Sequence, residues 1–328
     1  MSVPAIRTEG LTKRYGQLTA LDALEIEVGE GEVVGYLGPN GAGKTTTIRL
    51  LLGLSRASAG RAEIFGLDAQ AQTVEAHRRL AYVPGEANLW PSLTGAEVLH
   101  LLGRVQGQVD EAYRDELVER FDLDPSKKVR AYSKGNRQKV LLIGALMTRA
   151  DLLLLDEPTS GLDPLMEQAF RQAIGEARHE GQSVFLSSHI LSEVEALCDR
   201  VGILREGRLV EMGTLEEMRH LSSVTVEAVF DKAPPDLSGV PGVKRLVARG
   251  RHVHLEVQGP IEPLVDALAG TGVRELLSRE PSLEELSLAH YGPDGRAPAE
   301  VDSGAGAGAG AGQGAEQGPG AEPHRPAR

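Results

Sequence analysis

The sequence has a single cysteine, Cys198, and this scarcity excludes an internal disulfide. It also lacks an export signal, because the opening residues MSVPAIRTEG have neither the basic start nor the apolar middle of one. Both absences agree with a reducing compartment, where disulfides are rare. We therefore expect a cytoplasmic protein.

Long apolar runs are missing as well. The longest are VLLIGALM, which begins at Val140, and LLLL, which begins at Leu152. A helix needs roughly 20 apolar residues to cross a bilayer, so neither run is long enough. We expect no membrane-spanning segment in this sequence.

Positive charge is in the minority, since 35 Lys and Arg residues stand against 47 Asp and Glu, for a net charge of -12. This balance argues against a large contact surface for the phosphates of nucleic acid. The composition is otherwise that of a soluble protein, with 41% hydrophobic residues among 328. That length provides a full core, with room for two domains and a tail.

The order of apolar runs predicts an α/β fold. The run VVGYL, residues 33–37, is typical of a buried strand, and a glycine-rich loop and the helical segment KTTTIRLLLGL follow it. DLLLLD and SVFLSS are short apolar runs with polar ends, as buried parallel strands are. Between them, apolar residues recur at helical spacing from Pro164 to just before Gly181. Strand, helix and strand in this order predict a parallel sheet.

Two further regions depart from this pattern. The segments TGAEVLHLLGRV, DEAYRDELVERF and NRQKVLLIGALM are helical, so we expect a helical subdomain at about residues 86–150 within a first domain of residues 1–222. After Thr214, the runs VTVEAVF, VKRLVARG and HVHLEV alternate like half-buried strands, and EPLVDALAGTG and SLEELSLAHYG are helical. They predict a small α/β accessory domain at residues 223–291. Residues 292–328 are rich in Gly and Ala with almost nothing to bury, which predicts a disordered tail without a role.

The stretch GPNGAGKTT matches the phosphate-binding pattern G-x-x-x-x-G-K-[ST] and has the strand before it and the helix after it that this pattern needs. Its glycines let backbone N–H groups converge on phosphates, and the helix N-terminus adds positive potential. Lys44 would reach the β and γ phosphates, and Thr45 would offer its hydroxyl to Mg²⁺. The predicted ATP-binding residues of this loop are Gly38, Pro39, Asn40, Gly41, Ala42, Gly43, Lys44, Thr45 and Thr46.

The run LLLLDEP ends in two carboxylates. On their own they would be a solvated strand end, but downstream of a phosphate loop they have a specific chemistry. Asp156 is predicted to hold Mg²⁺, through water, and Glu157 to polarise the water that attacks the γ-phosphate. ATP and Mg²⁺ are therefore the predicted cofactors.

The stretch YSKGNRQK, residues 132–139, has the residue types of an anion-binding site, but no phosphate-binding loop lies near it in the sequence. Ser133 and the N–H groups near Gly135 begin a helix, and such a start attracts an anion. Together with GPNGAGKTT, LLLLDEP, SGLD (160–163) and SSH (187–189), this stretch resembles the motif set of the ATPase subunits of ABC transporters. The resemblance covers about residues 5 to 217.

This resemblance implies a P-loop ATPase core of the ABC type and a role for each matching residue. In that family the signature segment, here Ser133 to Gln138, faces the γ-phosphate bound by a second subunit. Three residues are implied to be catalytic: Lys44, Glu157 and His189, the last as the switch histidine at the γ-phosphate. The other implied nucleotide-binding residues are Tyr15, which would stack on adenine, Ser133, Gly135 and Gln138 of the signature, and Asp163, which would couple the two subunits.

One position departs from the family. A glutamine usually follows the strand that corresponds to LAYVP, where it contacts Mg²⁺ and water; here Gly85 holds that place and Glu86 follows it. Two interpretations are open. Glu86 reaches in as a substitute ligand for the metal and water, or this contact is missing and other residues couple the ATPase to the membrane subunit.

Next to it, Leu89, Trp90, Pro91 and Leu93 form an apolar group within a loop. In the family the neighbouring surface docks a helix of the membrane partner, and an exposed tryptophan suits such an anchor. Alternatively, Trp90 caps the core of the helical subdomain.

The resemblance implies a dimer that clasps two ATP molecules and drives a separately encoded permease at the inner face of the cell membrane. SKGNRQK, DEPTSGLDP and EPSLEELSLAHY resemble ATPase subunits of exporters of antibiotics, other drugs or sodium; an importer ATPase is an alternative. ATPases that act on DNA or the ribosome carry a long coiled coil or a second ATPase unit, which this acidic sequence lacks, so we expect no nucleic-acid partner. Glu157 and His189 argue against a subunit that gates without hydrolysis. The C-terminal domain either holds the two subunits of the dimer together or lowers their ATPase activity. Alternatively, it only stabilises the fold.

Overall fold

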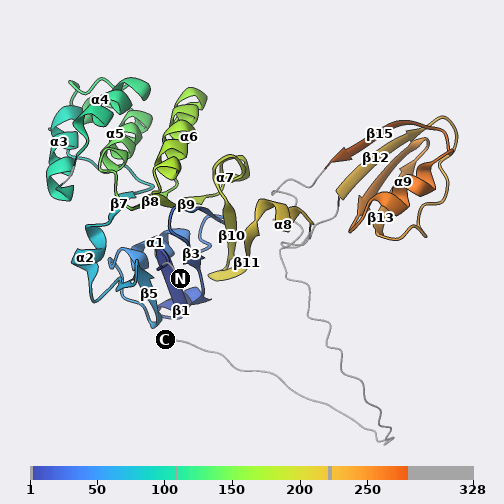
Figure 1. Ribbon diagram of the computed structural model, residues 1–328, viewed down its shortest axis with the longest axis horizontal. Helices are drawn as coiled ribbons and strands as arrows, with labels where there is room; N and C mark the ends of the chain where they lie inside the picture. Colours follow the sequence, from blue (N-terminus) through green and yellow to red (C-terminus); the bar gives the residue numbers. More distant parts are fainter. Residues whose placement is uncertain (1–2, 108, 221–223, 280–328) are drawn as a thin grey trace, which may run out of the picture. The chain divides into compact units, whose positions relative to one another are not determined.

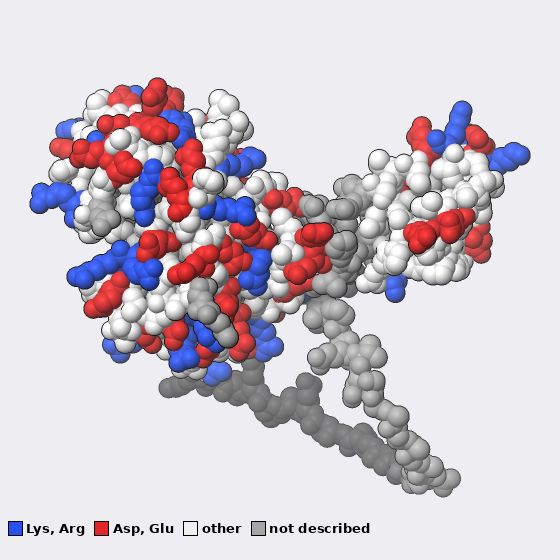
Figure 2. All heavy atoms as spheres, viewed as in Figure 1, with Lys and Arg blue, Asp and Glu red and all other residues white. Residues whose placement is uncertain are grey.

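The structure is a computed structural model that describes residues 3–107, 109–220 and 224–279. Figure 1 shows their path, in which groups of strands are separated by single helices or by groups of helices. Among these residues there is no helix long and apolar enough to span a membrane. On the face that Figure 2 shows, Lys and Arg are interspersed with Asp and Glu.

A six-stranded sheet lies at the centre of the larger part of the described chain. Four of its five pairings are parallel, as the sequence predicts, and only the outermost strand is antiparallel. Its central strands are buried on both faces, which explains their continuous apolar sequences. In spatial order the strands are β11 (Arg208–Thr214), β10 (Arg200–Arg205), β4 (Val33–Leu37), β9 (Ser183–Ser188), β8 (Leu152–Asp156) and β7 (Leu80–Val83).

A second, antiparallel sheet covers one face of this core. It comprises β1 (Ile6–Tyr15), β2 (Leu18–Leu24), β3 (Glu27–Val28), β5 (Ala59–Ile64) and β6 (Leu67–Asp68). The helix α1 (Lys44–Leu51) buries Ile48 and Leu50 in the same cluster as residues of both sheets, and the short α2 (Thr73–His77) follows β6. The sequence patterns considered above did not reveal this sheet, because its strands are only partly buried, and buried and exposed residues do not alternate regularly along them.

The predicted helical subdomain is observed as α3 (Gly95–Gln106), α4 (Glu111–Arg120), the 3-10 turn η1 (Val129–Ala131) and α5 (Lys134–Leu146). Thr94 and Glu97 form a reciprocal capping box at the start of α3, and Asp110 caps α4. The helix α6 (Pro164–His179) lies beside α5 in Figure 1. These helices share one apolar cluster with β8 and β9, so the subdomain packs directly on the sheet.

Two further helices, α7 and α8, complete the larger part of the described chain. The helix α7 (Leu191–Leu197) packs tightly on β4, since a Cβ built on Gly35 would lie 2.4 Å from the Cγ1 of Val194. After the β10–β11 hairpin comes the short α8 (Leu215–His220).

A third sheet has its own core, which Phe230, Leu255 and Leu264 help to build. Its four strands run in the order β13 (Val243–Arg249), β14 (His252–Val257), β12 (Val224–Phe230) and β15 (Val273–Arg279), and the helix α9 (Glu262–Leu268) packs into the same cluster. Three of these strands and the helix match the predicted α+β domain; β15 is an addition. The second predicted helix, about residues 282–292, and the tail at 292–328 lie outside the described residues. The domain boundaries themselves stay predictions.

Candidate active site

The phosphate loop runs from the end of β4 to the start of α1. Gly43 adopts a φ of 116°, in the left-handed region that favours glycine, and a Cβ there would lie 2.7 Å from the carbonyl oxygen of Ala20. No side chain caps the start of α1, which leaves its first backbone N–H groups free to bind an anion. The loop therefore has the geometry of a phosphate site.

Lys44 is 5% exposed and lies within this loop. Its Nζ donates to the carbonyl oxygens of Gly38, at 2.6 Å, and Pro39, at 3.3 Å. The same Nζ lies 3.2 Å from Oε1 of Glu157, which follows β8. The loop lysine and the predicted base are thus in direct contact.

Asp156 and Glu157 stand where β8 leaves the sheet, beside the end of β9. Asp156 is 3% exposed and accepts a hydrogen bond from Ser187 Oγ at 2.6 Å. The backbone N–H of Glu157 donates to the same Oγ at 3.2 Å and to the carbonyl oxygen of Ser187 at 3.1 Å. Ser187 therefore fixes the relative position of the two carboxylates.

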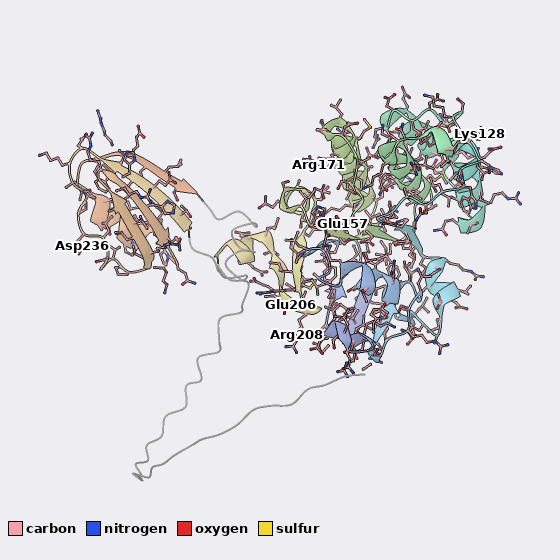
Figure 3. All side chains as sticks on the ribbon, turned by 180° about the vertical axis from the view of Figure 1, so that it is seen from behind. Lys128, Glu157, Arg171, Glu206, Arg208 and Asp236 are labelled. Atoms are coloured by element: carbon pink, nitrogen blue, oxygen red, sulfur yellow. The ribbon has the colours of Figure 1, made fainter. Side chains whose placement is uncertain are left out.

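Glu157 has a left-handed backbone, with φ at 51°. For a residue other than glycine this conformation costs on the order of 1–3 kcal/mol, and such strain gathers at functional sites. The turn brings Oε2 of Glu157 into contact with Nδ1 of His189, whose side chain is 48% exposed. Glu157 thus lies between a cation and an imidazole, at the place that Figure 3 labels.

The signature segment forms a different surface. Ser133 is exposed and caps α5 by accepting the N–H of Asn136 at 3.2 Å. A Cβ on Gly135 would lie 2.4 Å from the carbonyl oxygen of Gly161, so only glycine fits there. No hydrogen bond or ion pair joins Ser133 to Lys44 within the described chain. The described contacts of this helix start are therefore with the loop after β8 and not with Lys44.

Gln138 differs from the other predicted nucleotide contacts. Its side chain is fully buried, and its Nε2 donates to the carbonyl oxygen of Pro158 at 3.1 Å. In this conformation it supports the loop after Glu157 and does not face solvent. Lys134 makes a parallel contact, because its Nζ donates to Ser160 Oγ at 2.8 Å.

Three other predicted residues lie at the surface. Tyr15 ends β1, 48% exposed, with the Nζ of Lys13 4.7 Å from its ring centre. Asp163 is exposed and caps α6 by accepting the N–H groups of Leu165 and Met166, both at 3.1 Å. Glu86 is exposed, and the backbone beside it is close to the metal candidate, since a Cβ on Gly85 would lie 3.3 Å from the carbonyl oxygen of Asp156.

The residues present suit Mg²⁺, which prefers oxygen ligands and keeps several waters. Thr45 provides a hydroxyl, and Asp156 provides a carboxylate of which Oδ1 is bound to Ser187. The described residues contain no group of three or more His, Cys, Asp or Glu that would form a metal site. A bound Mg²⁺ would thus take further ligands from phosphate and water.

The contacts gather Lys44, Asp156, Glu157 and His189 at one edge of the sheet. Sequence reasoning missed two groups that support them. Ser187 was visible only as part of SSH, and nothing in the sequence pattern marked Glu193, which is buried in α7 and bonded to Thr159 and Ser188.

An apolar groove of about 300 Å³ lies between the core and the helical subdomain. Leu54 and Val105 on its rim are 67% and 76% exposed. Trp90 is not among the residues that line this groove; it is 50% exposed, whereas Leu89 and Leu93 pack against the core. Other apolar lining residues include Leu52, Tyr82, Leu102 and Leu141.

Comparison with known proteins gives concordant results. A family model described as ABC transporter matches residues 21–160. The daunorubicin resistance ATP-binding protein DrrA3 of Streptomyces coeruleorubidus is 35% identical over 90% of this chain and 98% of its own length. The Nod factor export ATP-binding protein I of Ralstonia nicotianae is 33% identical over 90% of this chain and 96% of its own length. The bacitracin transport ATP-binding protein BcrA of Bacillus licheniformis is 41% identical over 63% of this chain and 68% of its own length.

Solved structures show the same fold. An ATP-binding subunit of an ABC transporter superposes with a TM-score of 0.62, at 33% identity, over 66% of this chain and 92% of that one. A dimeric ATP-binding cassette in a post-hydrolysis state, bound to ADP and phosphate, gives a TM-score of 0.57 at 23% identity, over 64% of this chain and 98% of that one.

Proposed function

This chain belongs to the ATP-binding proteins of the ABC transporter family, and from that membership we propose that it powers export of a small, antibiotic- or drug-like molecule through a separately encoded permease. The chain is an ATPase of this family. The proposal concerns its cargo, its direction, its partners and the roles of individual residues.

One observation carries the proposal of a shared active site. Lys44, Glu157 and His189 are joined by direct contacts, whereas within the described residues no hydrogen bond or ion pair joins Ser133, at the start of α5, to any of the three. A second subunit, placed head to tail, would bring its Ser133 segment to the γ-phosphate held by this chain's loop. We propose a homodimer with two such composite sites.

Within each site we propose distinct roles for the residues of this chain. The loop N–H groups and Lys44 bind the phosphates, and Tyr15 stacks on adenine. Glu157 accepts a proton from the attacking water, and His189 orients Glu157 through the contact between them. Thr45 and Asp156 would hold Mg²⁺, which would supply positive charge beside the phosphates.

Export is supported by the relatives that align along nearly all of this chain. The protein named for daunorubicin resistance and the one named for Nod factor export both align to 90% of it, so the likeness includes the part after the ATPase core. An importer ATPase, and an ATPase without a transport partner, have no comparable support here. We expect the protein at the inner face of the cell membrane.

The permease would dock in the apolar groove. Its rim residues Leu54 and Val105 are strongly exposed, and exposed apolar side chains around a hollow are typical of a binding site for a short helix. The groove lies where the two subdomains meet, so a helix in it would sense their relative movement. Trp90, half exposed, would anchor the edge of the same interface.

The dimer is tested with two variants in the presence of the membrane partner. Glu157→Gln protein, saturated with Mg²⁺ and ATP, should dimerise in size-exclusion chromatography. Ser133→Arg should lose ATP hydrolysis but keep ATP binding, whereas Ser126→Arg, an exposed serine elsewhere in the helical subdomain, should keep both. A monomeric Glu157→Gln complex together with normal hydrolysis by Ser133→Arg would overturn the shared site.

Direction and docking need a membrane assay. Inside-out vesicles that contain the complex should accumulate a fluorescent polycyclic drug only with ATP; loss of drug from the vesicle interior would indicate import instead. Val105→Glu should prevent co-purification with the permease. Val74→Glu, at a valine that is also strongly exposed, at 65%, but lies outside the groove lining, should not.

A further inference from the structure

Glu193 is a carboxylate buried in the core without a cation. The residue is 7% exposed, on α7, and no Lys, Arg or His of the described residues forms an ion pair with it. Its Oε1 accepts a hydrogen bond from Thr159 Oγ1 at 2.5 Å, and its Oε2 accepts one from Ser188 Oγ at 2.7 Å. Burial of a carboxylate is costly unless donors satisfy it, so the two hydroxyls are what keep Glu193 in place.

The two hydroxyls belong to different catalytic loops. Thr159 lies two residues after Glu157, in the turn that leaves β8. Ser188 immediately precedes His189, at the end of β9, and its Oγ also accepts the N–H of Ile190 at 2.9 Å. One carboxylate thus holds the loop of the base and the loop of the histidine together.

The same turn after β8 is held from its other side by the signature helix. Gln138 donates to the carbonyl oxygen of Pro158, and Lys134 donates to Ser160 Oγ. Gly135 packs against the carbonyl oxygen of Gly161. These contacts connect α5 to residues 158–161, and Thr159 connects the same turn to Glu193.

We propose that Glu193 is a positioning residue that keeps Glu157 and His189 in register and links their geometry to the signature helix. The proposal rests on the catalytic roles given above to Glu157 and His189. Glu193 itself contacts neither of them; it acts through the hydroxyls of Thr159 and Ser188. Because nucleotide is bound by the phosphate loop, removal of this link should affect the hydrolytic step and not ATP affinity.

The test compares variants of the full chain, assembled with its membrane partner. Glu193→Ala should lower kcat for ATP hydrolysis at least tenfold, with KM and the dissociation constant of ADP within twofold of wild type. Glu193→Gln should restore kcat to within threefold, because the amide fits the same space and both hydroxyls are able to turn and bond to it. A purely structural role would instead lower the melting temperature without a change in kcat per folded molecule.

The donors provide matched controls. Thr159→Val and Ser188→Ala should each lower kcat. The kcat of the double variant should be no lower than that of the more impaired single variant, because both bonds end on the same carboxylate. Thr148→Val removes another buried hydroxyl, and Ser183→Ala removes one at the opposite end of β9; both should leave kcat unchanged. Normal kcat in Glu193→Ala, or equal losses in the control variants, would overturn the proposal. If wild-type protein does not hydrolyse ATP in this assembly, the proposed function fails instead.

Discussion

The Nζ of Lys44 lies 3.2 Å from Oε1 of Glu157, so the cation of the phosphate loop and the proposed base neutralise one another. Both side chains are largely buried, and the pair needs no further counter-charge. ATP brings several negative charges to the same loop. If Lys44 binds these phosphates as proposed, the charge that it shares with Glu157 is divided between the two, and the carboxylate is held less tightly.

Glu157 is predicted to act as the general base. Glu157→Gln should lower kcat by about 10²–10⁴-fold, the usual contribution of a general base, with ATP affinity unchanged or slightly higher because the competing partner of Lys44 loses its charge. Phosphate release and nucleotide titration measure the two effects. Glu206→Gln makes the same chemical change at another left-handed position and should have no effect on either. Comparable turnover in the two variants would exclude Glu157 as the base.

Tyr15 is predicted to bind adenine by stacking. Tyr15→Ala should weaken ATP binding by about 1–3 kcal/mol, which is roughly 5- to 150-fold, and Tyr15→Phe should retain most of the affinity because stacking needs only the ring. Calorimetry with Mg-ATP measures this. Leu18→Ala, at the residue paired with Tyr15 across the β1–β2 hairpin and 66% exposed, is the control. Equal affinities of wild type and Tyr15→Ala would place adenine elsewhere.

Gly135 is predicted to tolerate no side chain. Gly135→Ala would place a Cβ 2.4 Å from the carbonyl oxygen of Gly161, so α5 and the loop after β8 must separate, and ATP hydrolysis by the dimer should fall at least tenfold. Nucleotide binding by the single chain should not change. Gly175→Ala is the counterpart, since a Cβ there would meet no atom within 4 Å beyond the adjacent backbone of its own helix, and it should stabilise α6 by up to about 1 kcal/mol. Assays of hydrolysis and thermal unfolding distinguish the two.

Glu86 is predicted to substitute for the glutamine that this family has one position earlier. Glu86→Ala should raise the Mg²⁺ concentration for half-maximal hydrolysis several-fold and lower kcat, because a carboxylate near Asp156 would be lost. Asn88→Ala, an exposed neighbour, should behave as wild type. If Glu86→Ala leaves the Mg²⁺ titration unchanged, Glu86 does not contact the metal, and no residue at this position replaces the glutamine of the family.

Cys198 is predicted to be chemically silent in the folded protein. It is 9% exposed, and burial, followed by the nearby Asp199 carboxylate, raises the pKa of the thiol well above its ordinary value. Only the thiolate reacts readily, so a chromogenic disulfide reagent should label native protein on the order of 100-fold more slowly than unfolded protein. Between pH 7 and 8.5 the rate should rise with pH for the unfolded chain and stay low for the native one. Rapid labelling of native protein at pH 8 would show that α7 opens away from β4.

The central strands and the site motifs could be predicted from the sequence because each depends on residues that are close together in the chain. VVGYL and SVFLSS are apolar on both faces, and the Gly38–Thr46 loop must combine glycines with a lysine to bind phosphates. The strand β15 was not readable, since VRELLSR leaves Leu276 and Leu277 exposed and lacks the alternation of its neighbours. Glu193 was not readable either, because its partners are 34 and 5 residues away and only the fold brings all three together.

The left-handed turn at Glu157 bears on how this ATPase would respond to directed evolution. Glycine or asparagine suits that backbone better than glutamate, so either replacement should relieve strain while it removes the carboxylate. A library sorted for thermal stability alone would accordingly enrich such replacements at this codon. Its most stable members would be those that no longer hydrolyse ATP.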